Sequence, residues 1–172
     1  MEYGRNGTSP IHYFWSSSPL THHVKVFELI TGDYLFDPQS GTKYGKDDDH
    51  IAQIIELLGQ FPKSLCMGGK WSQEIFNRKG ELRNIHRLRH WALPDVLKEK
   101  YHFAAEDAKK IGEFLLPMLE LQPADRANAG GMSMHSFLTD AKGMENIALK
   151  GVTVGSKGDG IEGWAQEIKK PR

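Results

Sequence analysis

Residues 27–59, FELITGDYLFDPQSGTKYGKDDDHIAQIIELLG, decide how this chain folds. Three aspartates at positions 47–49 supply N-cap oxygens and place negative charge where a helix dipole favours it. Four apolar residues then recur at three- and four-residue spacing: Ile51, Ile54, Ile55 and Leu58. That spacing predicts one apolar helix face, and Gly59 is a typical C-terminal stop. The stretch therefore predicts a capped amphipathic helix.

A polar stripe lies opposite the apolar face of this predicted helix. Asp49, Gln53 and Glu56 fall at i, i+4 and i+7, which aligns them with an acid at each end. Asp33 lies upstream, in the segment ITGDYLF. On the pattern alone, the stripe is a helix cap followed by a solvated face, because most charged residues are simply exposed.

Composition sets limits on the class of protein. The chain has 172 residues, long enough for one domain with a core, and its 39% apolar and 26% charged content is ordinary for a globular protein. A formal net charge of zero gives no global field to steer nucleic acid or an anionic membrane towards it. No apolar run reaches the length of a membrane span. Cys66 is the only cysteine, which excludes an internal disulfide and fits a reducing compartment.

The segments around the central helix differ in regularity. Residues 1–23 contain glycines, prolines and a serine run, and we expect a poorly ordered leader. Residues 24–30 are apolar almost all round, which predicts the last turns of a buried helix. Residues 60–92 have no sustained period, so we expect an insert of turns and short helices. Its expected apolar anchors are Leu65, Trp71, Ile75, Phe76, Leu82 and Ile85.

After the insert, Pro94 suits the first position of a helix whose apolar side carries Val96, Leu97 and Tyr101, and two more helices are predicted after it. Residues 105–121 form the longer one, in which Pro117 should cause a kink because it removes a hydrogen bond. Its inward residues are Ala108, Ile111, Phe114, Leu115, Met118 and Leu119. Asn128 caps a shorter helix. Residues 141–172 form a glycine-containing tail.

Several sequence motifs do not meet the requirements of the binding sites that they resemble. The run from Gly155 to Gly160 lacks the order of a phosphate-binding loop, so we interpret it as flexible tail. His22 and His23 are adjacent and point apart, and no CxxC or HExxH motif occurs, so we expect no metal site. Basic residues gather beside Trp91: Arg83, His86, Arg87, Arg89 and His90. Such a cluster can bind single-stranded nucleic acid, but a solvated helix face is the favoured interpretation.

The chain resembles the C-terminal lobe of the SR protein kinases, which phosphorylate Arg-Ser-rich splicing factors. The matching words are FELITGDYLF, DDDHIAQIIELLG, FNRKGELRNI, EKYHF, FLLPMLEL, ADRANAGG and GMENI. They run in the family's order from about Phe27 to about Trp164. The resemblance implies an all-α fold: one incomplete C-terminal kinase lobe over residues 24–140, with an irregular insert at about 60–92 and flexible tails.

The resemblance also implies a substrate-docking groove beside the insert. In the family, acids and one lysine hold Arg-rich segments there. Matched by position, they are Asp33, Asp49, Glu56 and Lys100. Carboxylates suit this role because arginine offers a planar fork for paired hydrogen bonds. The family's docking acids thus coincide with the acidic stripe.

Arg126 lies in the ADRA word, where the family's arginine pairs with the glutamate of an APE motif. This sequence contains no APE. Arg126 would therefore be exposed, paired with another acid, or buried at a cost of several kcal/mol. We expect it to be exposed.

Kinase chemistry needs groups that hold ATP and magnesium, and the sequence contains neither HRD nor DFG. We therefore predict no catalytic residue, no metal site and no cofactor in this chain, although the family uses ATP and magnesium. We expect that the chain alone transfers no phosphate.

Three functional hypotheses follow. The first is a kinase fragment that retains the docking groove and binds Arg-Ser-rich protein segments. The second is a non-catalytic scaffold that binds proteins, or itself, through exposed apolar surface. The third is an RNA-binding element at residues 83–91, although we expect neither nucleic acid nor membrane as a partner. The resemblance implies a cytoplasmic and nuclear location.

Overall fold

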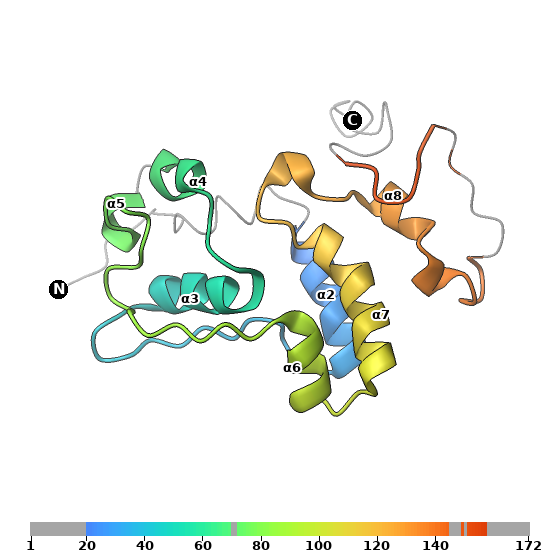
Figure 1. Ribbon diagram of the computed structural model, residues 1–172, viewed down its shortest axis with the longest axis horizontal. Coiled ribbons are helices and arrows are strands. Elements are labelled where there is room, and N and C mark those ends of the chain that lie inside the picture. The colour runs from blue at the N-terminus through green and yellow to red at the C-terminus, as the bar shows by residue number, and fades with distance from the viewer. Residues whose placement is uncertain (1–19, 70–71, 145–148, 150, 158–172) are drawn as a thin grey trace, which may run out of the picture. The chain divides into compact units, whose positions relative to one another are not determined.

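A computed structural model describes residues 20–69, 72–144, 149 and 151–157. Residues 1–19 of the expected leader, Trp71 and most of the distal tail lie outside these residues. Residues 20–23, which we expected to belong to the poorly ordered leader, are instead part of a helix, Leu20–Thr31. The chain divides into two compact units, Met1–Ala92 and Leu93–Arg172. Within the described residues the regular elements are helices, and two isolated β-bridges lie outside them. The predicted all-α fold is confirmed (Figure 1).

The described residues of the first unit contain four helices: α2 (Leu20–Thr31), α3 (Lys46–Leu58), α4 (Lys63–Gly68) and α5 (Ser72–Ile75). The expected helix over 24–30 is thus part of the longer α2. It is not buried all round as we predicted. Phe27 is 1% exposed, whereas Leu29 is 85% exposed, so one side of α2 carries the burial.

The central helix, α3, forms as the sequence predicts. Ile51, Ile54 and Ile55 are buried, and Gly59 ends the helix with a φ of 94° and a 2.9 Å bond from its N–H to the carbonyl of Ile55. Two details differ. The N-cap is Gly45, and the carboxylate of Asp48 accepts its backbone N–H at 3.0 Å. Leu57 is buried, whereas Leu58 is half-buried.

The insert consists of short pieces around a small apolar cluster, as expected. Phe76 and Leu82 form an antiparallel β-bridge, and the rings of Phe61 and Phe76 meet edge to face with centroids 6.2 Å apart. Ile75, Phe76 and Leu82 are buried as predicted, while Leu65 and Ile85 are half-buried. The insert also buries Phe61 and Cys66, and burial raises the pKa of the Cys66 thiol.

The second unit is built on two packed helices, α6 (Leu93–Glu99) and α7 (Ala105–Leu115). Gly112 permits their close approach, since a Cβ there would lie 3.0 Å from Cγ of Pro94. Beyond α7 the chain tightens into the 3₁₀ turn η1 (Leu116–Met118), so Pro117 ends the α-helix where a kink was expected. The predicted inward residues are all buried: Ala108, Ile111, Phe114, Leu115, Met118 and Leu119.

Three further short elements lie in the described part of the second unit: η2 (Pro123–Asp125), α8 (Ala129–Ser133) and η3 (Ser136–Leu138). Asn128 caps α8 as predicted, because its side-chain oxygen accepts the N–H of Gly131 at 2.8 Å. No helix among the described residues is long and apolar enough to cross a membrane.

Candidate functional site

The polar stripe of α3 contacts the loop that precedes the helix. Oδ2 of Asp49 accepts the backbone N–H of Gln39 and the side-chain amide of Gln53, both at 2.8 Å. Gln53 in turn accepts the N–H of Asp37 at 3.1 Å and donates to the carbonyl of the same residue at 3.2 Å. Two members of the stripe therefore fix residues 37–39 against the helix.

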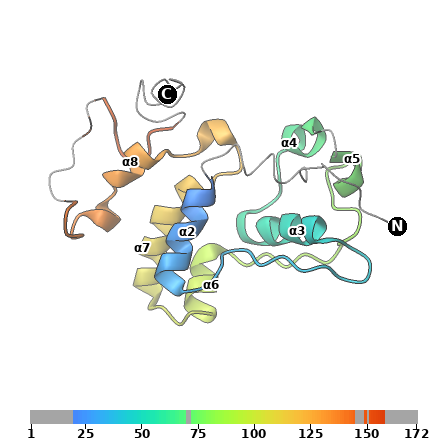
Figure 2. The same cartoon turned by 180° about the vertical axis from the view of Figure 1, so that it is seen from behind.

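A second segment, residues 83–91, lies along α3 and is called the strap here (Figures 1 and 2). Near the start of α3, Oδ1 of Asp48 accepts the side-chain amide of Asn84 at 3.0 Å. In the last turns, Oε1 of Glu56 accepts the N–H of Arg89 and the carbonyl of Glu56 accepts the N–H of Trp91, both at 2.8 Å. The strap is thus attached to both ends of the helix.

These contacts leave acceptor capacity on both predicted docking acids. The described hydrogen bonds of Asp49 use Oδ2, and the side-chain bond of Glu56 uses Oε1. Within the described part of the chain, Oδ1 of Asp49 and Oε2 of Glu56 make no hydrogen bond or ion pair. The two acids are seven positions apart on the helix, which places them about 10 Å apart along the axis. The result is two spaced carboxylates, each held in place by a hydrogen bond from a backbone N–H of another segment.

The other two predicted docking residues lie in different places. Asp33 is exposed in the turn after α2, where its N–H bonds to Oγ1 of Thr31 at 3.2 Å and Gly32 adopts a φ of 77°. Lys100 is exposed after α6 in the second unit. Its Nζ lies 2.8 Å from the Tyr101 hydroxyl and 4.7 Å from the ring centroid. The three acids therefore belong to the first unit, and Lys100 belongs to the second.

Arg126 corrects our expectation of an exposed side chain, since it is only 4% exposed. Its Nε donates to the carbonyl of Glu120 at 2.9 Å, and Nη2 lies 3.5 Å from the carbonyl of Leu121. Burial lowers the pKa of Arg126, and the nearby charge of Glu120 acts in the opposite direction. The guanidinium thus organises the turn after η1.

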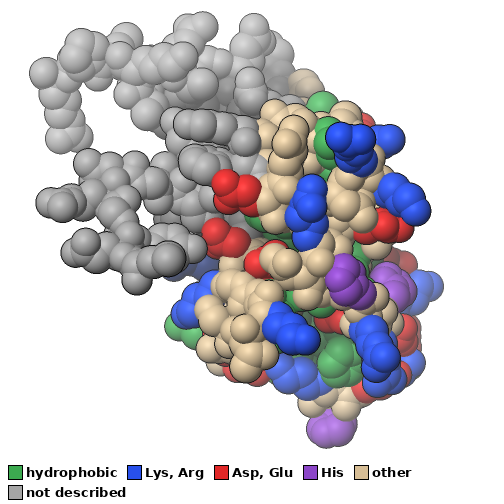
Figure 3. Space-filling view, turned by 90° about the vertical axis from the view of Figure 1, so that its left-hand side faces the viewer, with side chains coloured by type: hydrophobic (Ala, Val, Ile, Leu, Met, Phe, Trp, Pro, Cys, Tyr) green, Lys and Arg blue, Asp and Glu red, His purple; other side chains and the backbone are tan. Residues whose placement is uncertain are grey.

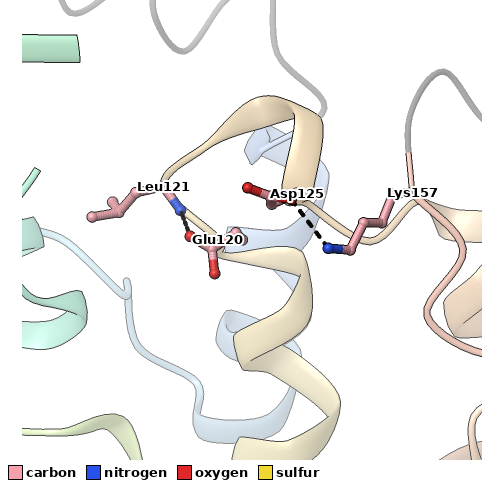
Figure 4. Close-up of polar contacts among 4 residues, drawn as sticks. All are labelled: Glu120, Leu121, Asp125 and Lys157. Carbon is pink, nitrogen blue, oxygen red and sulfur yellow. Dashed lines mark hydrogen bonds and ion pairs between the residues drawn. The ribbon is translucent and has the colours of Figure 1, made fainter. Parts of the chain in front are cut away.

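The polar contacts around this turn reach into the tail (Figure 4). Oε1 of Glu120 accepts the N–H of Leu121 at 2.9 Å, and Lys157 forms an ion pair with Asp125 at 3.1 Å. Lys157 also forms a β-bridge with Ala127. The part of the Gly155–Gly160 run that the structure describes, residues 155–157, is therefore docked rather than flexible. The sequence carried no signal of this pairing.

The remainder of that run lies outside the described residues. Residues 158–163, GDGIEG, which overlap the end of this run, fit the G-x-G-x-x-G spacing. This spacing indicates a phosphate site only between a strand and a helix. Among the residues with described positions, no group of three or more His, Cys, Asp or Glu could hold a metal ion.

The basic cluster is not on a helix, which corrects the favoured interpretation of that segment. Residues 83–91 have no helical backbone. Arg83, His86, Arg87, Arg89 and His90 are exposed, and Trp91 is 39% exposed. The sequence contains no sign of the hydrogen bonds that attach this segment to α3, because they join residues more than thirty positions apart.

Comparison with known proteins places the chain among protein kinases. It is 54% identical over 144 residues to protein kinase dsk1 of Schizosaccharomyces pombe, which covers 84% of this chain and 26% of that protein. It is 50% identical over 155 residues to the serine/threonine-protein kinase SKY1 of Saccharomyces cerevisiae, covering 90% of this chain and 20% of that kinase. No family model matches the chain.

An animal relative aligns over a shorter region. SRSF protein kinase 3 of Homo sapiens is 52% identical over 113 residues, which is 66% of this chain and 20% of that kinase. The chain thus spans about a fifth to a quarter of the length of these relatives.

Proposed function

The chain belongs to the SR protein kinase family as part of a C-terminal kinase lobe, and on that premise we propose that it docks Arg-Ser-rich protein segments. Asp49 and Glu56 of α3 bind arginines of the segment, and Asp33 supplies a third acid. Lys100 sets the register of the bound segment by pairing with an acid of that segment or of the groove. The parent activity is ATP-dependent phosphorylation of serine or threonine, to which no residue of this chain is assigned.

The observation that carries this proposal is the spare acceptor capacity of Asp49 and Glu56. Each side chain already accepts a backbone N–H of another segment through one oxygen, from Gln39 at Asp49 and from Arg89 at Glu56, so its orientation is fixed before any ligand arrives. The second oxygen remains to accept a guanidinium. Less side-chain entropy is lost when an ordered carboxylate binds, which favours affinity.

Isosteric substitutions test the proposal without removing the structural contacts. Asn at 49 and Gln at 56 still present an oxygen to the N–H groups of Gln39 and Arg89, but they carry no charge. Titration calorimetry with an Arg-Ser-rich peptide should give an affinity on the order of micromolar for the parent chain. The Asp49→Asn/Glu56→Gln double variant should bind at least about tenfold more weakly, a loss of about 1.4 kcal/mol.

A matched control exists on α7. Glu106 and Glu113 are also exposed and seven residues apart on one helix. The Glu106→Gln/Glu113→Gln variant removes the same charge with the same spacing, and it should bind the peptide like the parent. Binding by the parent should also weaken as salt rises, because charge pairing is screened. Equal affinity for the α3 double variant and the parent would leave the stripe only its structural role of holding residues 37–39 and the strap.

A second function, self-association, is favoured by exposed apolar side chains in the first unit. Leu29 of α2 is 85% exposed and Tyr34 is 64% exposed. Sedimentation velocity over a range of concentrations should show a dimer that Leu29→Gln weakens. A chain that sediments as a monomer at every concentration would exclude this alternative.

A further inference from the structure

The strap is rich in basic side chains. Within the described residues, none of its five basic side chains forms an ion pair. The lysines of the second unit differ, since Lys98, Lys109, Lys110 and Lys157 each pair with an acid at 3.1–3.8 Å. Figure 3 shows a face on which basic, acidic and His side chains are interspersed, as expected of a chain with zero net charge.

The strap is fastened through groups that leave its charges available. Glu56 bonds to the backbone of Arg89 and Trp91, and Asp48 bonds to the amide of Asn84. Among the described contacts, Arg83 uses only Nε, which donates to the carbonyl of Phe76 at 3.0 Å. The acids of α3 thus position the segment while the guanidinium groups of Arg87 and Arg89 remain exposed. A ligand would therefore meet exposed guanidinium groups on a segment whose backbone is held in place.

Trp91, the last residue of the strap, adds an aromatic surface to it. The side chain is 39% exposed, while its backbone N–H is fixed to the carbonyl of Glu56 at 2.8 Å. A base can stack on such a ring, and guanidinium groups beside it can contact phosphates. An acidic peptide would use the charges but would gain little from the ring. Single-stranded nucleic acid is therefore the ligand that uses both features.

We propose that the strap, residues 83–91, binds single-stranded nucleic acid, with Arg83, Arg87 and Arg89 on phosphates and Trp91 stacked on a base. This goes beyond the docking of Arg-Ser-rich segments and does not depend on it. Binding should be weak and independent of base sequence, because neither phosphate contact nor stacking reads a base edge. With three arginines on phosphates, log K should fall with log salt at a slope of about −2.

The test is fluorescence anisotropy of the whole chain with a labelled oligouridylate. We expect binding at about 50 mM salt and much weaker binding at about 200 mM. Arg87→Gln/Arg89→Gln should weaken binding at least about tenfold and reduce the salt slope by about 1.4. Trp91→Ala should weaken binding at least about fivefold, and Trp91→Phe, which keeps a ring, should retain most of it. These substitutions keep the backbone N–H groups that bind Glu56.

The matched control removes two lysines of α7. Lys109→Gln/Lys110→Gln deletes the same charge outside the strap and should leave binding unchanged. Equal loss with this control, or unchanged binding after the double arginine substitution, would overturn the proposal. Absence of binding at low salt would do the same. An oligoglutamate that binds more tightly than the oligouridylate would assign the strap to an acidic protein and also overturn it.

Discussion

The carboxylate of Glu56 accepts the backbone N–H of Arg89 at 2.8 Å, across 33 positions of the sequence. The carbonyl of the same residue accepts the N–H of Trp91. One residue near the end of α3 therefore fixes the strap twice, once through its side chain and once through its backbone. Only the first of these contacts responds to substitution.

Glu56→Ala should release the Arg89 amide and lower the free energy of unfolding by about 1 kcal/mol, the usual net value of one hydrogen bond. Glu56→Gln keeps an acceptor and should cost less. Urea denaturation measures the difference, and hydrogen exchange should show faster exchange of the Arg89 amide in Glu56→Ala. If the alanine and glutamine variants exchange alike at Arg89, this hydrogen bond contributes nothing to the position of the strap.

Arg126 should tolerate lysine poorly despite the equal charge. Its guanidinium reaches the carbonyls of Glu120 and Leu121 from a position that is 4% exposed. Lysine has one compact ammonium and cannot reproduce the two-sided contact. We expect Arg126→Lys to destabilise the chain by about 1–3 kcal/mol in urea denaturation. Arg78→Lys, at an exposed position, is the control and should change stability little. A neutral effect at 126 would mean that these carbonyls are satisfied without the fork.

Gly131 allows the tail to approach α8. A Cβ at this position would lie 2.5 Å from the backbone N of Ser156 and 3.1 Å from its carbonyl oxygen. Gly131→Ala should therefore displace residues 155–157 and lower stability by about 1–3 kcal/mol. Gly68→Ala in α4 meets nothing within 4 Å and should be neutral or stabilising. Thermal melts of the two variants compare them directly, and equal melting temperatures would show that the tail does not dock here in solution.

His50 predicts a loss of stability on acidification. Burial lowers its pKa below the ordinary value, although Asp47 and Asp49 oppose this effect, and its ring lies 5.5 Å from that of Phe36. The unfolded chain therefore binds the proton more readily than the folded one. The contribution of His50 to the free energy of unfolding should therefore be fully present above about pH 6.5, and the free energy of unfolding should fall as the pH drops below that value.

Urea midpoints between about pH 7.5 and pH 5.5 measure this dependence. His50→Gln does not titrate and should flatten the profile over this interval. A profile that is as steep in the variant as in the parent would assign the pH dependence to other groups.

The sequence predicted what depends on local pattern. The three aspartates, the isoleucine spacing and Gly59 indicated the position and faces of α3, because cap and periodicity are properties of neighbouring residues. It could not predict the burial of Arg126, whose acceptors are the backbone carbonyls of Glu120 and Leu121 and leave no trace in residue identity. The strap and the docked tail were missed for a related reason, since their partners are distant in sequence and mostly backbone.

The unequal hydrogen bonding of Asp49 and Glu56 leads to a prediction about the two arginines they would bind. Oδ2 of Asp49 already accepts two hydrogen bonds, whereas Oε1 of Glu56 accepts one. Each carboxylate oxygen offers two lone pairs. Glu56 can therefore receive both prongs of a guanidinium, while Asp49 offers only Oδ1. A lysine should replace arginine with little loss at Asp49 and with a larger loss at Glu56.

Double-mutant cycles measure this difference, with single arginine-to-lysine changes in the docked peptide set against Asp49→Asn and Glu56→Gln. The peptide position that couples to Glu56 should lose about five- to tenfold in affinity when arginine becomes lysine, because the second charge-assisted bond is lost. The position that couples to Asp49 should lose about twofold or less. If both positions lose equally, the carboxylates are equivalent towards the ligand, and the contacts to Gln39 and Gln53 do not persist when the peptide is bound.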